Sequence, residues 1–334
     1  MNGHLAPPWP QRYLGLSFGW AGVDLFFVLS GFLITGILRR LRGDSDYYPA
    51  FYSRRARRIL PPAVLILAAS SAVAADAGRF SWPLFGMYAT FTTSLVPSGW
   101  WFAQLALLPR ISARGLGLMW TLSVEEIFYF LWAPVVRRCS MSALAAICVG
   151  AIVVAPPMRL WLHAPGSPEQ YFFLTRMDAL AWGAVAALAL EGDARRLARR
   201  SSLVAAVAIL ALVTIFLLTD HGDVGHRLFA VAGYTILDAA CAAVVVAAVT
   251  QPSRWRWLRQ PALTYAGTIS YSLYLVHWPI SQLIGMITGG AENDRTTLRI
   301  VLTLSLSALV ASASWRYLEA PLLNRGASRT ARYR

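Results

Sequence analysis

The sequence predicts an all-α protein, a polytopic integral membrane helical bundle with about nine crossings. Hydrophobic residues make up 57% of the 334 residues and charged residues only 14%, and the mean hydropathy is +0.52. An ordinary soluble chain has about 45–50% apolar and about 25% charged residues. This composition excludes disorder, a coiled coil, a disulfide-stapled mini-domain and most soluble enzymes. The apolar residues are spread along the whole chain, so we expect one transmembrane domain over residues 1–320.

Ten apolar segments support this prediction, because a crossing helix needs about 20 mostly apolar residues. They are residues 18–38, 59–76, 82–95, 116–136, 140–157, 174–191, 202–219, 228–249, 266–287 and 298–318. The segment 82–95 is short, and 266–287 contains a proline. The basic tail 321–334 is expected to be disordered and cytoplasmic.

Arginine sets the predicted orientation. All 30 basic residues are Arg, the net charge is +14, and the arginines gather in short clusters between apolar runs, as in cytoplasmic loops. Placing loops 39–58, 137–139, 192–200 and 250–260 and the C-terminus inside makes every segment after residue 116 alternate correctly. We therefore predict a multi-pass protein of the plasma (inner) membrane. Membrane-length apolar runs separate the clusters, so no nucleic-acid partner is predicted.

The segment 82–110 conflicts with a simple alternation. If 82–95 crossed the membrane once, every later arginine cluster would lie outside. Its tryptophans, prolines and glycine suit a broken, interfacial segment. We expect residues 82–110 to enter and return, or to lie along the outer interface, which leaves nine crossings and an external N-terminus. One more helix would normally precede such a chain, and residues 1–10 look like its end.

Ionisable residues inside the predicted spans are few, and each costs about 2.5–3.5 kcal/mol on insertion scales, so they mark a function by default. They are Asp24, Glu125, Glu126, Arg176, Asp178, Asp238 and His277, and His4 lies just before the first span. Glu125 and Glu126 point about 100° apart on a helix, so they need separate partners, and two together favour a polar cavity. Either glutamate could pair with Arg176. Asp238 is expected to be hydrogen-bonded structurally, and His277 to be a satisfied core residue by default.

Two further runs have both a structural and a functional interpretation. Residues 22–35 place Asp24 in a first helical turn and a small Ser30-Gly31 pair two turns deeper, which on spacing alone favours a helix start and a packing notch. Residues 51–62 put four arginines at the inner mouth of the second span. Arginine forks bind phosphate bidentately. The positive-inside rule and anionic lipid explain the same charge equally well.

No metal site is predicted. The three cysteines, Cys139, Cys148 and Cys241, have no metal-ligand spacing and are interpreted as small hydrophobic residues. A short outer loop, 219–226, contains two histidines and two aspartates. These are metal-ligand residue types, but the loop alone does not predict a site.

Six motifs, in order along about the whole chain, resemble those of the membrane-bound acyltransferase family 3, bacterial O-acyltransferases that modify sugars. They are GVDLFFVLSGFLIT (22–35), FYSRRARRILPP (51–62), WTLSVEEIFYFLW (120–132), RMDALAWGA (176–184), SYSLYLVHWPI (270–280) and YLEAPLLNR (317–325). The resemblance implies transfer of an acyl group, usually acetyl from acetyl-CoA or another acyl-CoA, to a hydroxyl of a carbohydrate or similar acceptor. It also implies that the chain lacks most of the family's first transmembrane helix. In the family, that helix carries an Arg about three turns before the catalytic His.

The resemblance also implies residue roles. The catalytic set is His4, the general base, with Asp24, Glu125 and Glu126. The set that would hold the phosphates of coenzyme A is Arg54, Arg55, Arg57 and Arg58. The substrate-cavity set is Ser30, Arg176, Asp178 and His277. Ser30 would hydrogen-bond within the cavity, the favoured reading, or carry the acyl group. A separate extracytoplasmic partner is a further expectation for handing over the acyl group.

Two other functions stay open at this stage. A transporter or flippase for a lipid-linked sugar shares buried charges and a midplane cavity, but it predicts inverted halves that this sequence does not show. An inactive truncated relic is the other alternative. The acceptor also stays open among a cell-surface polysaccharide, peptidoglycan, a glycolipid and a secreted small molecule.

Overall fold

A computed structural model describes residues 21–96, 103–162, 171–192, 194–218, 227–288 and 296–327. Every regular element in these ranges is helical, so the predicted all-α class is confirmed. The long helices are α1 (Ala21–Leu41), α2 (Tyr47–Asp76), α6 (Trp120–Arg138), α7 (Met141–Leu162), α8 (Met177–Ala189), α9 (Ala194–Leu218), α10 (Tyr234–Thr250), α11 (Pro261–Ile287) and α12 (Thr296–Ser314). The short ones are α3 (Trp82–Ala89), α5 (Arg110–Gly117) and α13 (Ala320–Ala327), joined by 3₁₀ and π segments.

Five helical stretches are long and apolar enough to cross a membrane. They are Ala21–Leu41, Tyr47–Asp76, Met141–Leu162, Phe229–Thr250 and Thr297–Asn324. Large apolar side chains face outward on the outer helices; for example, Leu210 on α9 and Leu309 on α12 are each 67% exposed. A soluble monomer rarely exposes such long apolar faces, so lipid is their natural surrounding. The chain is therefore a polytopic membrane bundle, and its number of crossings stays a prediction.

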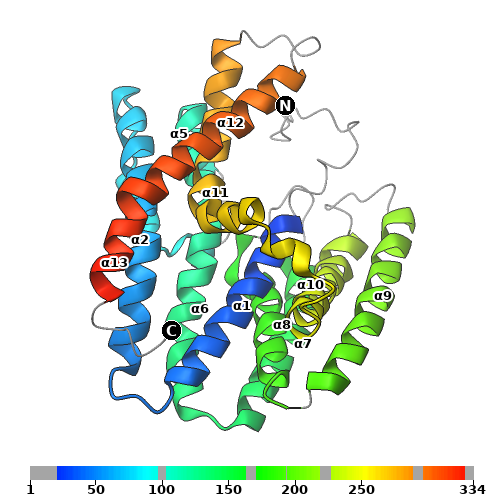
Figure 1. The fold of residues 1–334 in the computed structure, drawn as a ribbon. Coiled ribbons are helices and arrows are strands. Elements are labelled where there is room, and N and C mark those ends of the chain that lie inside the picture. Colours follow the sequence, from blue (N-terminus) through cyan, green and yellow to red (C-terminus); the bar gives the residue numbers. More distant parts are fainter. Residues whose placement is uncertain are drawn as a thin grey trace.

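Helix α1 lies at the centre of the bundle and packs against α8, α10, α6 and α2. In Figure 1, α2 lies on one side of α1 and α9 on the other, and the end of the chain (α12 and α13) crosses in front of α2. The closest approach joins α1 to α8. A Cβ on Gly31 would lie 2.0 Å from the carbonyl oxygen of Leu180, and a Cβ on Gly183 would lie 2.0 Å from that of Val28. The expected packing notch at Gly31 is therefore present, and it faces α8.

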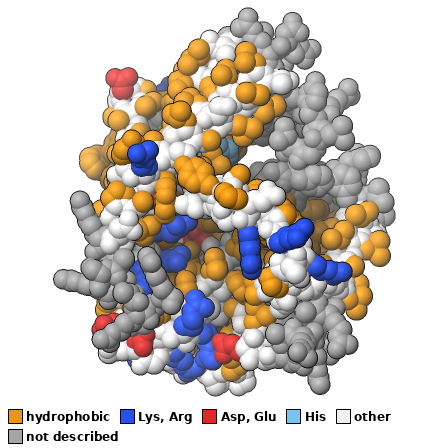
Figure 2. Space-filling view, viewed as in Figure 1, with side chains coloured by type: hydrophobic (Ala, Val, Ile, Leu, Met, Phe, Trp, Pro, Cys, Tyr) orange, Lys and Arg blue, Asp and Glu red, His pale blue; other side chains and the backbone are white. Residues whose placement is uncertain are grey.

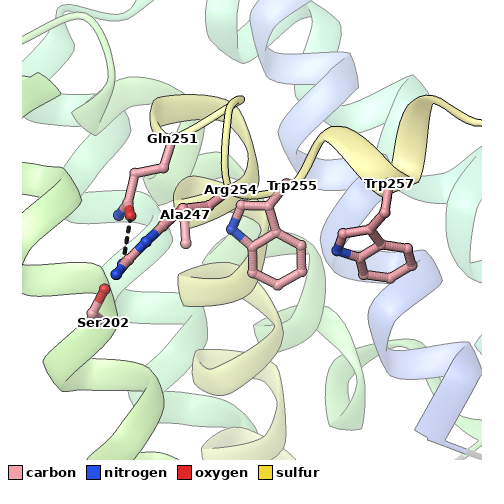
Figure 3. Close-up of a pocket in the computed structure, with 6 residues that line it drawn as sticks. All are labelled: Ser202, Ala247, Gln251, Arg254, Trp255 and Trp257. Atoms are coloured by element: carbon pink, nitrogen blue, oxygen red, sulfur yellow. Dashed lines mark hydrogen bonds between the residues drawn. The ribbon is translucent and has the colours of Figure 1, made fainter.

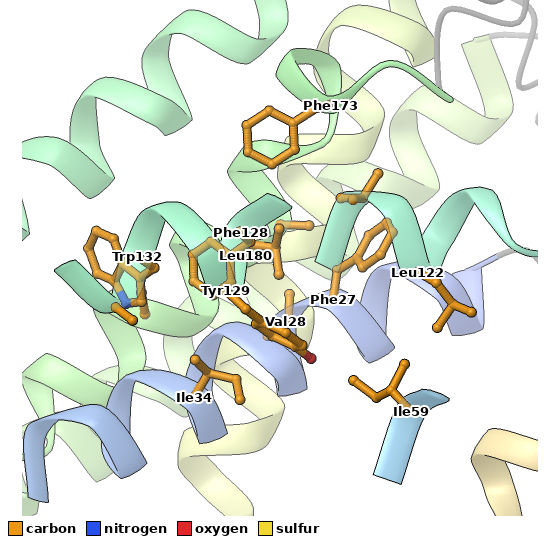
Figure 4. Close-up of a cluster of buried hydrophobic side chains, with 14 of the residues drawn as sticks. Phe27, Val28, Ile34, Ile59, Leu122, Phe128, Tyr129, Trp132, Phe173 and Leu180 are labelled. Carbon is orange, nitrogen blue, oxygen red and sulfur yellow. The ribbon is translucent and has the colours of Figure 1, made fainter. Parts of the chain in front are cut away.

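The hydrophobic core fills the space between α1, α6 and α8 (Figure 4). Phe27 and Val28 of α1 are fully buried there, as is Leu180 of α8. From α6, Phe128 and Trp132 stack with ring centroids 5.7 Å apart. The Trp132 indole donates a hydrogen bond to the hydroxyl of Thr35 (2.9 Å), so the core fixes the register of α6 along α1.

The predicted loop 39–58 is wrong, because α1 continues to Leu41 and α2 already begins at Tyr47. Tyr47, Ala50 and Phe51 recur at helical spacing and are buried, and the Tyr47 hydroxyl donates to the carbonyl of Ala133 on α6 (2.7 Å). This apolar stripe makes the segment helical despite its charge. The arginine run 54–58 therefore lies within α2, two to three turns from its start.

The prediction of a broken segment after residue 82 is confirmed for the described part. Helix α3 ends at Ala89, a turn with Phe91 at φ +54° follows, and a 3₁₀ turn spans Thr93–Leu95. The hydroxyl of Ser123 on α6 donates to the carbonyl of Phe91 (2.6 Å) and accepts from the amide of Ser94 (3.0 Å). Residues 97–102 lie outside the described ranges, and residues 321–327 of the predicted tail lie in α13.

Candidate functional site

Glu125 forms the first of two polar groups in the bundle. It is on α6, only 2% exposed, and accepts a hydrogen bond from the hydroxyl of Ser30 on α1. The phenol of Tyr129, one turn further along α6, lies beside both of these side chains. A carboxylate at this depth is costly unless polar groups surround it. The serine–glutamate pair (Ser30 and Glu125) is therefore a built polar site.

The arginine run of α2 lies against this pair. Arg55 and Arg58 are within electrostatic range of Glu125, and Arg55 is within range of Glu126. The guanidinium of Arg55 lies 6.0 Å from the ring centre of Tyr129. All four arginines of the run are half-buried rather than freely solvated. The structure thus brings the predicted phosphate-binding residues next to the predicted catalytic glutamates.

Arg176 belongs to a second group and not to the glutamates. Its Nη2 donates to Oδ1 of Asp24 on α1 (2.7 Å), and both side chains are 2% exposed or less. Its guanidinium lies 4.4 Å from the ring centre of Tyr234 and 5.6 Å from that of Phe27. The glycine contact between α1 and α8 explains this choice of partner, because it brings the first turns of the two helices together.

Asp178 pairs with an arginine that the sequence had not marked. Arg159, near the end of α7, donates to both oxygens of Asp178 (3.1 and 2.9 Å), and both side chains are fully buried. The same guanidinium donates to the carbonyls of Thr175 (2.6 Å) and Val231 (3.3 Å) and to the Thr235 hydroxyl (2.5 Å). Val231 lies in the π-helical turn Phe229–Gly233, where the backbone ladder is interrupted. Arg159 therefore connects α7, α8 and α10.

Asp238 completes the buried charge cluster, which we define as Asp24, Arg159, Arg176, Asp178 and Asp238. It is fully buried, beside Asp24 and within range of both arginines. No donor among the described residues reaches its oxygens, and its polar neighbour is the carboxyl of Asp24, so the expected structural hydrogen bonding stays a prediction. Three carboxylates and two guanidiniums carry a net charge of −1 if all are ionised.

His277 lies near a proline in α11. Its Nδ1 is 2.6 Å from the carbonyl oxygen of Tyr274. A carbonyl can only accept, so Nδ1 carries the proton and Nε2 keeps its lone pair. The ring is half-buried, 5.8 Å from the ring of Tyr274.

Most of the described site residues thus fall into two groups, both anchored on α1, whereas the structure does not bring His277 of α11 into either. Asp24 and Ser30 are six residues apart, or about 9 Å along the helix. His4 and the loop 219–226 lie outside the described residues. Sequence reasoning missed Arg159, and one signal could have found it: this arginine is at the outer end of its segment, where the orientation rule predicts none.

Glu319 was also missed as a site residue. It is fully buried and accepts from the hydroxyls of Ser272 (2.6 Å) and Ser314 (3.0 Å). A π-helical turn, Trp315–Glu319, presents it. Tyr271, whose hydroxyl donates to the carbonyl of Ile59 (2.8 Å), is within range of Glu319 and of Glu125. The motif YLEAPLLNR (317–325) contained this glutamate, but no role was predicted for it.

Comparison with known protein families gives one match over nearly all of the chain. Residues 1–316 match the model of a family described as an acyltransferase domain. The chain belongs to this family. Membership confirms the resemblance seen in the six motifs and places the chain among enzymes that transfer acyl groups.

Curated relatives agree with the family. One is YrhL of Bacillus subtilis, a putative peptidoglycan O-acetyltransferase, which is 29% identical over 93% of this chain and 52% of the relative. Another is OatA of Listeria monocytogenes, a peptidoglycan O-acetyltransferase, which is 26% identical over 93% of this chain and 53% of the relative. OatA of Staphylococcus aureus, an O-acetyltransferase, is 25% identical over 97% of this chain and 55% of the relative. The chain spans about half the length of these relatives. No solved structure is significantly similar to it.

Proposed function

We propose that the chain is a membrane O-acyltransferase that moves an acyl group, in the first place acetyl, from a coenzyme A thioester to a hydroxyl of a carbohydrate or similar acceptor. One observation carries the proposal: Glu125 is buried inside the helical bundle, hydrogen-bonded to Ser30 and next to the arginine run. The printed names of the relatives support acetyl as the group and make peptidoglycan one candidate acceptor.

On the donor side, Arg54, Arg55, Arg57 and Arg58 would hold the phosphates of coenzyme A. Arginine is suited to this role because its fork matches two phosphate oxygens at once. The run lies within α2 beside Glu125, which supports a donor that enters from the cytoplasmic side and reaches into the bundle.

On the acceptor side, His4 would remove the proton of the acceptor hydroxyl as general base. The oxygen then attacks the thioester carbonyl, the C–S bond breaks, and the thiol leaves with the proton. Asp24, fixed by Arg176, would orient or charge-stabilise His4. The remaining polar side chains would line the passage between the two sides. They are Ser30, Glu125, Glu126, Arg176, Asp178 and His277.

The proposal includes a location and a partner. We place the C-terminus and the donor in the cytoplasm and the acceptor on the far side of the plasma membrane. We also propose that a separate extracytoplasmic protein handles the acyl group where a handover is needed.

Labelled acetyl-CoA, supplied to membranes that contain the chain together with candidate glycan fractions, tests this function. The wild type should transfer label to one of the fractions. Glu125→Gln should lower the rate about 100-fold or more, in line with the loss of an essential polar group at a reacting centre. Combined Arg57→Ala and Arg58→Ala should raise the apparent KM for the donor.

Controls separate chemistry from folding. Glu191→Gln changes a surface acid, 40% exposed, outside both polar groups and should leave transfer unchanged. Each variant is compared at equal abundance in the membrane. If the wild type moves a labelled lipid-linked sugar but consumes no thioester, the chain is a transporter and the proposal fails. If Glu125→Gln transfers like the wild type, Glu125 has no catalytic role.

A further inference from the structure

The turn between α10 and α11 is rich in arginine and tryptophan, and the roles proposed above do not include these residues. Residues 254–259 read Arg-Trp-Arg-Trp-Leu-Arg, with three cations and two indoles in six positions. Trp257 is 50% exposed and Leu258 is 40% exposed. The short 3₁₀ helix Arg256–Arg259 holds four of these six residues, and none of the four is buried.

A hollow of about 510 Å³ opens beside this turn. It is lined by Ser202, Ala247, Gln251, Arg254, Trp255 and Trp257 (Figure 3). The two indoles point to the same side of the turn, with ring centres 6.1 Å apart and planes tilted by 31°. Nη1 of Arg254 donates to the side-chain oxygen of Gln251 (3.1 Å), which holds this guanidinium toward the hollow. Small-molecule sites usually measure about 300–1,000 Å³.

This combination suits one chemical class of ligand. Indole faces stack on nucleobases, arginine forks bind phosphate, and an amide and a hydroxyl offer hydrogen bonds to a purine edge. The same residues would also suit an interfacial anchor, where tryptophan and arginine meet lipid headgroups. An anchor explains the exposed side chains, but it does not explain an open hollow toward which Gln251 holds the Arg254 guanidinium.

The position of the turn favours a ligand shared with the arginine run. In Figure 2, basic side chains border a recess that lies below α11, on the side of α2 and on the side of the turn. The turn leads directly into α11, and α11 reaches α2 through the Tyr271–Ile59 hydrogen bond, next to Arg58. A long anionic molecule with a nucleotide at one end could therefore contact both.

We infer that the hollow beside the turn binds the nucleotide end of the coenzyme A thioester, with Trp255 and Trp257 against the adenine and Arg254 on phosphate. The inference rests on the proposed function, because it assumes this donor. The inference adds a binding site for the nucleotide. Contacts at this site would increase the affinity for the coenzyme A thioester although they lie far from the reacting carbonyl.

Two donors that differ only in the nucleotide test this site. Acetyl-CoA carries it, and acetyl-pantetheine does not. Trp257→Ala, and separately Arg254→Gln, should raise the KM for acetyl-CoA about tenfold or more with little change in kcat, since stacking on one base is worth roughly this much. Transfer from acetyl-pantetheine should be unchanged. Labelled coenzyme A should also bind the variants more weakly, and adenosine 3′,5′-bisphosphate should displace it from the wild type.

Trp161→Ala is the matched control, because Trp161 on α7 is 77% exposed and lies outside the hollow. It should affect neither donor. If Trp257→Ala or Arg254→Gln reduces transfer equally with both donors, the turn is a structural element. If the reduction depends on anionic lipid and not on the nucleotide, the turn is a membrane anchor. Either result would overturn the inference. If the wild type uses acetyl-pantetheine but Trp257→Ala leaves both KM values unchanged, the site fails while the proposed function stands. If the wild type uses neither thioester, the proposed function itself fails.

Discussion

Gly31 allows the backbones of α1 and α8 to touch, and this contact decides which charged residues meet. A Cβ at this position would lie 2.0 Å from a backbone oxygen, which cannot move without shifting α8. We expect Gly31→Ala to lower the free energy of unfolding by about 3 kcal/mol or more, at the upper end of overpacking effects. Unfolding in detergent micelles, followed by helical circular dichroism, measures this change.

Gly150 provides the control for this prediction. It also lies within a helix, α7, but nothing approaches the position of its missing Cβ within 4 Å. Gly150→Ala should stabilise the protein by up to about 1 kcal/mol, because alanine is the better helix former. Equal effects of the two substitutions would contradict the close approach of α1 and α8.

Two arginine–carboxylate pairs have the same chemistry but differ in how far they are buried. Arg159 and Asp178 are fully buried, whereas the side chains of Arg39 and Glu191 are 20% and 40% exposed. Arg159→Met should destabilise the fold by about 3–5 kcal/mol, because it leaves a buried carboxylate without its cationic partner and with only the Thr235 hydroxyl as a donor. Arg39→Met should cost only about 0.2–1 kcal/mol, because water screens that pair. The same unfolding measurement compares the two variants.

The exposed pair also predicts a pH dependence. Hydrogen bonds from Arg39 lower the pKa of Glu191 below its ordinary value. A carboxyl with a lowered pKa stabilises the fold above the ordinary pKa of about 4.3, and this contribution is lost as the pH falls through the lowered value. The difference in unfolding free energy between wild type and Arg39→Met should therefore vanish in acid. A difference that grows in acid would contradict this assignment.

At the scale of elements, Ser123 holds the broken segment after α3. Its hydroxyl bonds the carbonyl of Phe91 and the amide of Ser94, and Ser94 is fully buried. Ser123→Ala leaves both backbone groups without this partner, at a cost of about 1–3 kcal/mol. Hydrogen exchange at the Ser94 amide should accelerate about tenfold or more. Thr214→Ala, which removes a hydroxyl bonded within α9, should leave that amide unchanged.

The sequence predicted most helices but placed the starts of two of them too late. The predicted loop 192–200 is wrong because α9 already begins at Ala194, and α2 begins within the predicted loop 39–58. Hydropathy located the apolar spans and the break after residue 82. It missed the first three turns of α2 because their arginines lowered the local hydropathy, although Tyr47, Ala50 and Phe51 had helical spacing. Amphipathic helix starts of this kind need the periodicity of the buried face in addition to the mean hydropathy.

At the scale of the whole molecule, charge in an apolar chain was enough to mark most of the buried ionisable residues but not their partners. Asp24, Arg176 and Asp178 were found because ions are rare in spans. Their pairing depends on which helices touch, and the contact at Gly31 pairs Asp24 with Arg176. The serine–glutamate pair required the register of α6 on α1, which tertiary packing alone provides. Arg159 was missed because it lies just beyond the predicted end of its segment.

The central claim is that the bundle joins a thioester on the cytoplasmic face to a hydroxyl on the opposite face. Sealed vesicles of known orientation test this directly, since acetyl-CoA does not cross the membrane. Inside-out vesicles given labelled acetyl-CoA outside should acetylate a glycan enclosed within them, and right-side-out vesicles should do so only when the donor is loaded inside. Transfer that is equal in both orientations, or that modifies only a glycan on the donor's own side, would contradict the claim.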